Sequence, residues 1–156
     1  MGAAPVLNPA FVDEVRRQVN ASPFVSHLPM RLVDFSADGA RIELDVARCH
    51  LQPFGLVHGG VLATLIDTAT FWAAFANAPD GAGLVNVDLL LTYLETVAEG
   101  LLVAEGRLIR AGRTLSYAEA SIHTGDGRLL VRGSSTLFTL PGKGFRLDIP
   151  KFLPAG

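Results

Sequence analysis

The sequence lacks the residues from which several common kinds of site are built. It has a single cysteine, Cys49, so an internal disulfide cannot form. Its histidines do not stand at the short spacings, such as HxH or HxxxH, that are typical of zinc ligands; they are His27, His50, His58 and His123. We therefore expect neither a disulfide scaffold nor a metal site.

An excess of basic charge is also missing. The chain has 13 Lys and Arg against 15 Asp and Glu, a formal net charge of -2, and so lacks the positive field that attracts nucleic-acid phosphates. Residues 1–9 have neither the basic start nor the long apolar run of a signal peptide, and Val6 stands where a myristoylation signal has Ser or Thr. These absences predict a cytoplasmic protein with no nucleic-acid partner.

The longest apolar run, residues 61–78, is not free of polar groups. Asp67 lies in its middle and Asn77 near its end, and a carboxylate at the centre of a bilayer is costly. We interpret this run as a buried helix of a soluble protein and expect no membrane partner.

The composition favours one well-packed unit. The chain has 156 residues, of which 49% are hydrophobic and 18% charged, so it can bury a large core and is not typical of a disordered protein. This length predicts a single domain over residues 1–156. Because monomers rarely expose large apolar patches, the shortage of charge also predicts that another copy of the chain covers part of the surface.

The hydrophobic pattern predicts a helix, a hairpin, a long helix and then strands. Apolar residues recur on one face of residues 9–20, and a hairpin with one polar face follows over 31–46. After the apolar helix, four strands joined as a meander are expected at 84–94, 101–110, 115–124 and 129–140. We predict an α+β fold in which an antiparallel sheet wraps around the apolar helix, with a core over 30–140 and a tail, 141–156, packed on it.

Two features of the apolar helix suggest chemistry. Gly59 and Gly60 at its start offer backbone N–H groups at the positive end of the helix dipole, where a carbonyl oxygen or oxyanion is stabilised. Asp67 lies among apolar residues, and its carboxylate needs either a partner or a function. Eight residues of helix separate Gly59 from Asp67 by about 12 Å, so we expect a homodimer in which Gly59 of one chain and Asp67 of the other share a site.

Further polar residues stand at fixed spacings around these two features. They are Gln52, the run His58-Gly59-Gly60, Asp67, the pair Asn86 and Asp88, and residues 104–113, which include Arg110 and Arg113. An HGG run with an acid nine residues after its histidine and a glutamine six before it is a specific pattern. Over Met30–Leu140 the chain resembles the hotdog-fold acyl-CoA thioesterases of the phenylacetate-pathway (PaaI-like) and 4-hydroxybenzoyl-CoA type.

This resemblance implies a hotdog fold and the hydrolysis of acyl-CoA to free acid and coenzyme A. It also implies dimers that often pair into tetramers, so we expect a homotetramer. Gly59 would donate its N–H to the thioester carbonyl, Gln52 would hold the same region with its side-chain amide, and His58 would orient the site. Asp67 of the partner copy would act as general base or as nucleophile. No metal or redox cofactor is implied, since coenzyme A is part of the substrate.

The substrate-binding residues that we expect are Gly60, Phe71, Arg110 and Arg113. The two arginines match the basic pair that lies near the coenzyme A phosphates in relatives. Relatives often place Ser or Thr one turn after the acid, or on the following strand, to hold the attacking water. Phe71 occupies the first position here and would border the acyl pocket, and Asn86 at the second would hold the water.

Two other functions remain open at this stage. A hotdog hydratase or dehydratase shares the fold and the coenzyme A substrates but places a histidine across the reacting carbons from the acid. A non-catalytic module would bind acyl-CoA without turnover. The acyl group itself, aromatic or a short, medium or long chain, does not follow from the sequence.

Overall fold

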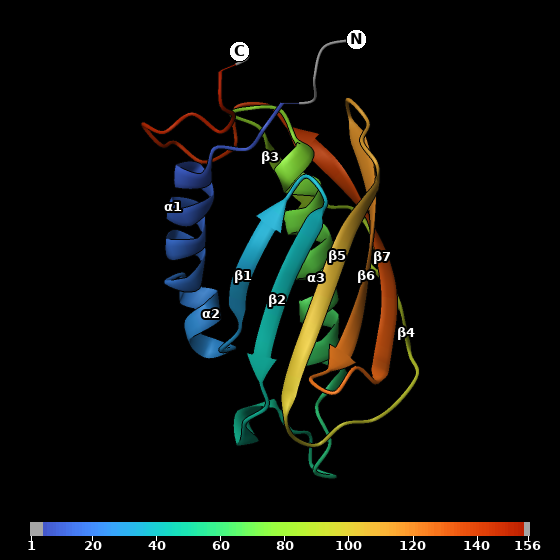
Figure 1. The fold of residues 1–156 in the computed structure, drawn as a ribbon. Helices are drawn as coiled ribbons and strands as arrows, with labels where there is room; N and C mark the ends of the chain where they lie inside the picture. The colour runs from blue at the N-terminus through green and yellow to red at the C-terminus, as the bar shows by residue number, and fades with distance from the viewer. Residues whose placement is uncertain (1–4, 155–156) are drawn as a thin grey trace.

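The computed structural model describes residues 5–154, which form helices and one sheet (Figure 1). The helices are α1 (Pro9–Asn20), α2 (Pro23–His27) and α3 (Gly59–Asn77), with a 3₁₀ turn at Arg48–His50. The strands are β1 (Arg31–Ser36), β2 (Gly39–Asp45), β3 (Gly83–Asn86), β4 (Leu90–Tyr93), β5 (Leu101–Arg110), β6 (Leu115–Thr124) and β7 (Leu129–Leu140).

All strand pairs are antiparallel and belong to one sheet. The order is β1-β2-β5-β6-β7-β3, and β4 also pairs with β7. Figure 1 shows the sheet curling around α3, and α1 standing beside β1 at one side. Alternating burial along the strands gives the sheet an inner, apolar face toward α3. In β2, Ala40, Ile42 and Leu44 point inward and are buried, while the residues between them are more exposed.

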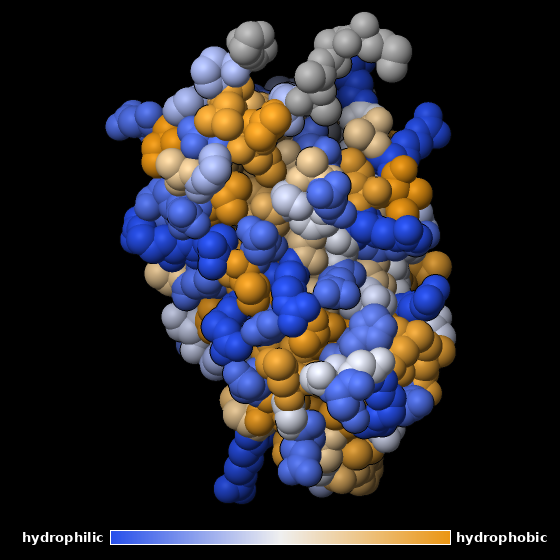
Figure 2. Space-filling model, in the orientation of Figure 1, coloured by the Kyte–Doolittle hydropathy of each residue, from blue (hydrophilic) through white to orange (hydrophobic). Residues whose placement is uncertain are grey.

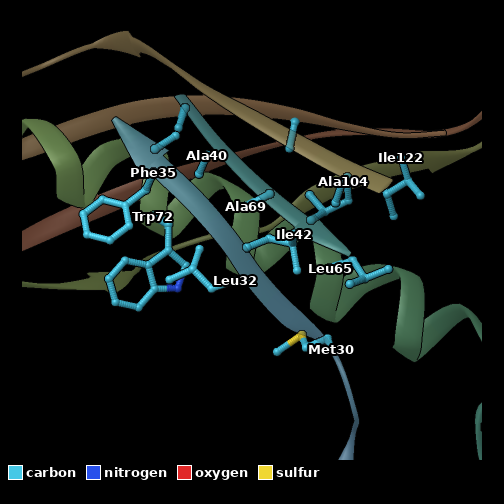
Figure 3. Packing of buried hydrophobic residues seen from close by; sticks show 14 of the residues in the cluster. Met30, Leu32, Phe35, Ala40, Ile42, Leu65, Ala69, Trp72, Ala104 and Ile122 are labelled. Atoms are coloured by element: carbon cyan, nitrogen blue, oxygen red, sulfur yellow. The ribbon is translucent and has the colours of Figure 1, made fainter. Parts of the chain in front are cut away.

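The core forms between α3 and the inner face of the sheet. Leu65, Ile66 and Ala69 on the helix have no exposed surface, and Figure 3 shows α3 side chains clustered with those of β1 and β2. Helix and sheet approach closely at Gly106 of β5, where a Cβ would lie 2.2 Å from the Ala69 carbonyl oxygen. Any other residue there would push the helix away from the sheet.

The C-terminal tail docks at the end of α3. Lys151 is 1% exposed, and its ammonium group donates to the carbonyl oxygens of Phe75 and Ala78, both at 2.6 Å. The cation thereby meets two carbonyls at the negative end of the helix, of which that of Phe75 also accepts the N–H of Ala78 at 3.1 Å. Burial lowers the pKa of Lys151 to about 8. A β-bridge between Leu7 and Phe152 ties the tail to the segment before α1.

The expected strand over residues 84–94 and its place in a meander were wrong. The segment forms two strands, β3 and β4, and both pair with β7 rather than with β5. Between them Asp88 leaves the ladder: its carboxylate accepts the N–H of Thr136 at 2.8 Å, and its carbonyl accepts the hydroxyl of Ser135. The edge of β5 is already taken by β2, so β7 offers the free edge.

This architecture confirms the expected α+β hotdog fold, a curled antiparallel sheet around one long helix. Within residues 5–154, α3 is the one helix long and apolar enough to span a membrane, and most of its side chains are buried inside the protein. It begins at Gly59, so both glycines of the HGG run lie in its first turn.

Candidate active site

The first turn of α3 is organised by His58. This residue is the N-cap, with φ -64° and ψ 134°, and its Nδ1 accepts the N–H of Gly60 at 2.8 Å. Nδ1 therefore acts as the acceptor that caps the first turn of the helix. Its own backbone N–H donates to the His50 carbonyl at 2.8 Å, which fixes the loop before the helix.

The two glycine amides consequently differ. Gly60 was expected to face the substrate, but its N–H is bonded to His58 and does not supply a second free donor. The N–H of Gly59 donates to no acceptor within residues 5–154. Gly59 is therefore the one amide of the pair that can bind an incoming carbonyl oxygen at the positive end of the helix.

Gln52 lies in a short loop that leads to His58. Its side-chain oxygen accepts the N–H of Phe54, and its backbone N–H donates to the Leu56 carbonyl at 2.8 Å. A bridge between Leu51 and Val57 closes the base of this loop. Within the described chain the side-chain nitrogen of Gln52 has no acceptor, so a donor is available at this position.

Asp67 and Asn86 meet directly. The amide nitrogen of Asn86, on β3, donates to Oδ1 of Asp67 at 2.7 Å. Partial burial raises the pKa of Asp67 above its ordinary value, and the bond from Asn86 acts in the opposite direction. Asn86 was expected to hold a water molecule; the structure shows it holding the carboxylate. The second oxygen, Oδ2, accepts no hydrogen bond from residues 5–154.

Within one chain Gly59 and Asp67 do not converge. They lie on the same helix, eight residues and about 12 Å apart along its axis. The two groups that could act on one carbonyl therefore stand at opposite ends of a two-turn stretch of α3. The prediction that a second copy completes the site remains a prediction.

The other residues that were expected at the site are Phe71, Arg110 and Arg113, and none of them hydrogen-bonds to Gly59 or Asp67 within residues 5–154. Phe71 is partly buried and belongs to an aromatic cluster, with its ring stacked on Phe75 at 6.1 Å and edge-on to Trp72 at 5.2 Å. Arg110 ends β5 and Arg113 lies in the turn that follows, and both side chains are exposed. Neither arginine forms an ion pair with any residue between 5 and 154, so both are free to meet an anion.

One residue of this site, Tyr93, was not predicted from the sequence. Tyr93, at the end of β4, donates its hydroxyl to the Gly59 carbonyl at 2.9 Å. The two residues are 34 positions apart, and no spacing motif links them. In the described residues, no group of three or more His, Cys, Asp or Glu side chains is arranged to hold a metal ion.

A family model described as the thioesterase superfamily matches residues 54–131, half of the chain. This range contains His58, Gly59, Asp67, Asn86 and Tyr93. The chain belongs to the thioesterase superfamily. This membership indicates that the chain is a hydrolase and that its general activity is the hydrolysis of thioesters.

Named relatives agree with this membership. The proofreading thioesterase EntH of Klebsiella pneumoniae is 32% identical over 105 residues, which cover 67% of this chain and 76% of that protein. Acyl-coenzyme A thioesterase 13 of Mus musculus is 28% identical over 107 residues, with the same two shares. The crystal structure of a Haemophilus influenzae thioesterase superposes with a TM-score of 0.78 at 24% identity, covering 87% of this chain and 94% of that one. That superposition shows that this chain and the Haemophilus influenzae protein have the same fold.

Proposed function

We propose that this protein hydrolyses acyl-CoA thioesters to a free acid and coenzyme A. The observation that carries the proposal is the N–H of Gly59 at the start of an apolar helix, which donates to no acceptor in the described chain and lies beside an amide that His58 has already bound. The mouse relative is named for acyl-coenzyme A, which supports this substrate class. The side chains of Arg110 and Arg113, exposed and without an ion-pair partner among the described residues, suit the phosphates of coenzyme A.

The thioester carbonyl oxygen would accept the Gly59 N–H. As a nucleophile adds to the carbonyl carbon, negative charge grows on that oxygen, and the amide and the helix dipole stabilise it more in the transition state than in the substrate. The free side-chain nitrogen of Gln52 is a further donor near the same helix start. His58 contributes by holding the neighbouring peptide in place.

Asp67 would supply the nucleophile. As a general base it takes a proton from water, the resulting oxygen bonds to the carbonyl carbon, and the C–S bond breaks to release the coenzyme A thiol, which recovers the proton. As a nucleophile its own oxygen would bond to the carbonyl carbon and the C–S bond would break, so that coenzyme A leaves as a thiolate; water would then hydrolyse the anhydride, which frees the acid and the Asp67 carboxylate and supplies the proton that the thiolate takes up. Asn86 holds Oδ1 in both cases and leaves Oδ2 available. This sequence of steps draws on no metal or redox cofactor.

A homodimer would complete the site, with Gly59 of one chain facing Asp67 of its partner. The edge formed by β3 and β4 favours such pairing because one side of its backbone is unpaired in the described chain, and apolar side chains line it. Val85, Val87, Leu90 and Leu94 are 45%, 60%, 73% and 51% exposed. Figure 2 shows hydrophobic surface along the side of the molecule where β4 lies. We also expect two such dimers to pair into a tetramer, as the resemblance to hotdog-fold thioesterases implies.

The test is thiol release from a panel of phenylacetyl-, benzoyl-, short-, medium- and long-chain acyl-CoA, followed with a chromogenic thiol reagent. We expect release from at least one class, which also identifies the acyl group. An enoyl-CoA in the same panel is assayed for 3-hydroxyacyl-CoA. Hydration without thiol release would replace this proposal with a hydratase, and tight binding without any turnover would replace it with a binding module.

The pH profile tests the pair formed by Asp67 and Asn86. Asp67 must be ionised to act, so activity is present above its pKa and falls as the pH falls through it. Because the bond from Asn86 lowers the pKa of Asp67, Asn86→Ala should move the acid limb of kcat/KM to higher pH. Asn77→Ala removes an amide at the other end of α3 and should leave the limb in place. An unmoved limb in Asn86→Ala would show that Asp67 does not set it.

A further inference from the structure

The hydroxyl of Tyr93 reaches from the edge strand to the start of α3. It donates to the Gly59 carbonyl at 2.9 Å, although the residue as a whole is 52% exposed. The ring lies so close that a Cβ on Gly59 would be 3.2 Å from the hydroxyl oxygen and 3.3 Å from Cζ. Glycine at position 59 therefore leaves room for the ring of Tyr93.

This hydrogen bond is not needed to satisfy the backbone. In an α-helix the carbonyl of Gly59 faces the amide of Ala63, four residues on, and accepts its N–H. The Tyr93 hydroxyl uses the remaining lone pair of the same oxygen. Its effect is therefore on the orientation of the peptide rather than on an orphaned polar group.

The peptide unit between Gly59 and Gly60 is held at both ends. Its oxygen accepts from Tyr93, and its N–H donates to Nδ1 of His58 at 2.8 Å. Two successive glycines are the most flexible backbone that a chain can offer, so this double restraint removes freedom where it is greatest. The free N–H of Gly59 belongs to the preceding peptide and is linked to the restrained one through a single pair of dihedral angles.

We propose that Tyr93 is a positioning residue of the thioesterase site, which holds the Gly59–Gly60 peptide so that the Gly59 N–H points at the thioester oxygen. The inference rests on the proposed function. It also explains how the edge segment serves the site, because Asn86 on β3 bonds to Asp67 while Tyr93 on β4 bonds to Gly59. One segment of 11 residues, 83–93, thereby touches both reactive positions of α3.

The two hydrogen bonds from Tyr93 and His58 form a clamp on the Gly59–Gly60 peptide. Tyr93→Phe tests this clamp because it removes the hydroxyl and keeps the ring. We expect kcat for thioester hydrolysis to fall about five- to tenfold, the effect of one lost hydrogen bond, while KM changes less than twofold. In ¹⁵N-labelled protein, the amide of Gly60 should exchange with solvent at least threefold faster. The chain contains one other tyrosine, Tyr117, which is 37% exposed on β6, and Tyr117→Phe should leave all three quantities at the wild-type value.

The outcomes separate this inference from the proposed function. Wild-type kcat together with wild-type Gly60 exchange in Tyr93→Phe would overturn the clamp, and so would equal losses in Tyr93→Phe and Tyr117→Phe. A fall in kcat with a proportional rise in KM would also overturn it, since that indicates a general loss of substrate binding. If the wild type releases no thiol from any thioester, the proposed function fails, and Gly60 exchange still decides whether Tyr93 restrains the peptide.

Discussion

Replacing Asp67 with asparagine should lower kcat for thioester hydrolysis about a hundredfold or more, with little change in KM. This is the scale of a lost general acid–base group, and a lost nucleophile costs at least as much. Asparagine has nearly the shape of aspartate and can still accept a hydrogen bond from Asn86, which holds Oδ1 at 2.7 Å in the wild type. The substitution therefore removes the charge and the proton acceptor with little change in packing. Thiol release under saturating acyl-CoA measures the effect.

The stability of Asp67→Asn should move in the opposite direction to its activity. Burial raises the pKa of Asp67, so the folded state disfavours the ionised carboxylate relative to the unfolded chain. A neutral side chain avoids that cost, and at pH 7 the free energy of unfolding should rise or stay unchanged. Lower activity in a protein of equal or greater stability would exclude partial unfolding as the cause.

A surface carboxylate serves as the matched control. Asp38 lies in the turn between β1 and β2 with an exposed side chain, and Asp38→Asn makes the same chemical change near the C-terminal end of α3, where Asn77 donates to the Ala37 carbonyl. Its kcat should equal that of the wild type. Full activity in Asp67→Asn, or equal losses in the two variants, would remove Asp67 from the mechanism.

The parts of the fold that the sequence predicts well depend on local or strongly periodic patterns. Residues 9–20 were expected as a helix and form α1, because Asn8 caps it and its apolar residues recur on one face. α3 is apolar enough to be recognised as the core helix without knowing its neighbours. The prediction that a sheet wraps around it follows from the need to cover that surface.

The error over residues 84–94 has a non-local cause. Local alternation cannot show that β2 occupies the edge of β5, and this pairing decides that the segment joins β7 instead. The break at Asp88 depends on the amide of Thr136, 48 residues away. Pairing partners at such separations are set by the closed sheet, and no single segment carries them.

The residues of the site also differ in whether local sequence or distant contacts bring them together. Gly59, His58 and Asp67 stand within ten residues of one another, so a spacing pattern can connect them. The bond from Asn86 to Asp67 and the bond from Tyr93 to Gly59 appear only when β3 and β4 lie along the sheet edge. That placement also changes the expected part of Asn86, from holding water to holding the carboxylate.

A proline at position 59 isolates the contribution of one amide. Gly59 is the first residue of α3, a position where proline is favoured because its missing N–H has no partner in the helix. His58 has the extended backbone, φ -64° and ψ 134°, that the residue before a proline prefers. Gly59→Pro should therefore leave the helix intact, remove the proposed donor to the thioester oxygen, and lower kcat about a hundred- to a thousandfold.

Gly59→Ala is the control that makes this result interpretable. Alanine keeps the N–H and adds a Cβ at the position where proline also carries one, 3.2 Å from the Tyr93 hydroxyl oxygen. Both variants therefore place a Cβ against Tyr93, and the ratio of their kcat values reports on replacing the N–H by the proline ring rather than on crowding by Cβ. We expect Gly59→Ala to retain most of its activity and both variants to show cooperative thermal unfolding. Equal kcat in the two variants would mean that the start of α3 matters for its shape, and that the oxyanion is stabilised by another donor, of which the free side-chain nitrogen of Gln52 would then be the first to test.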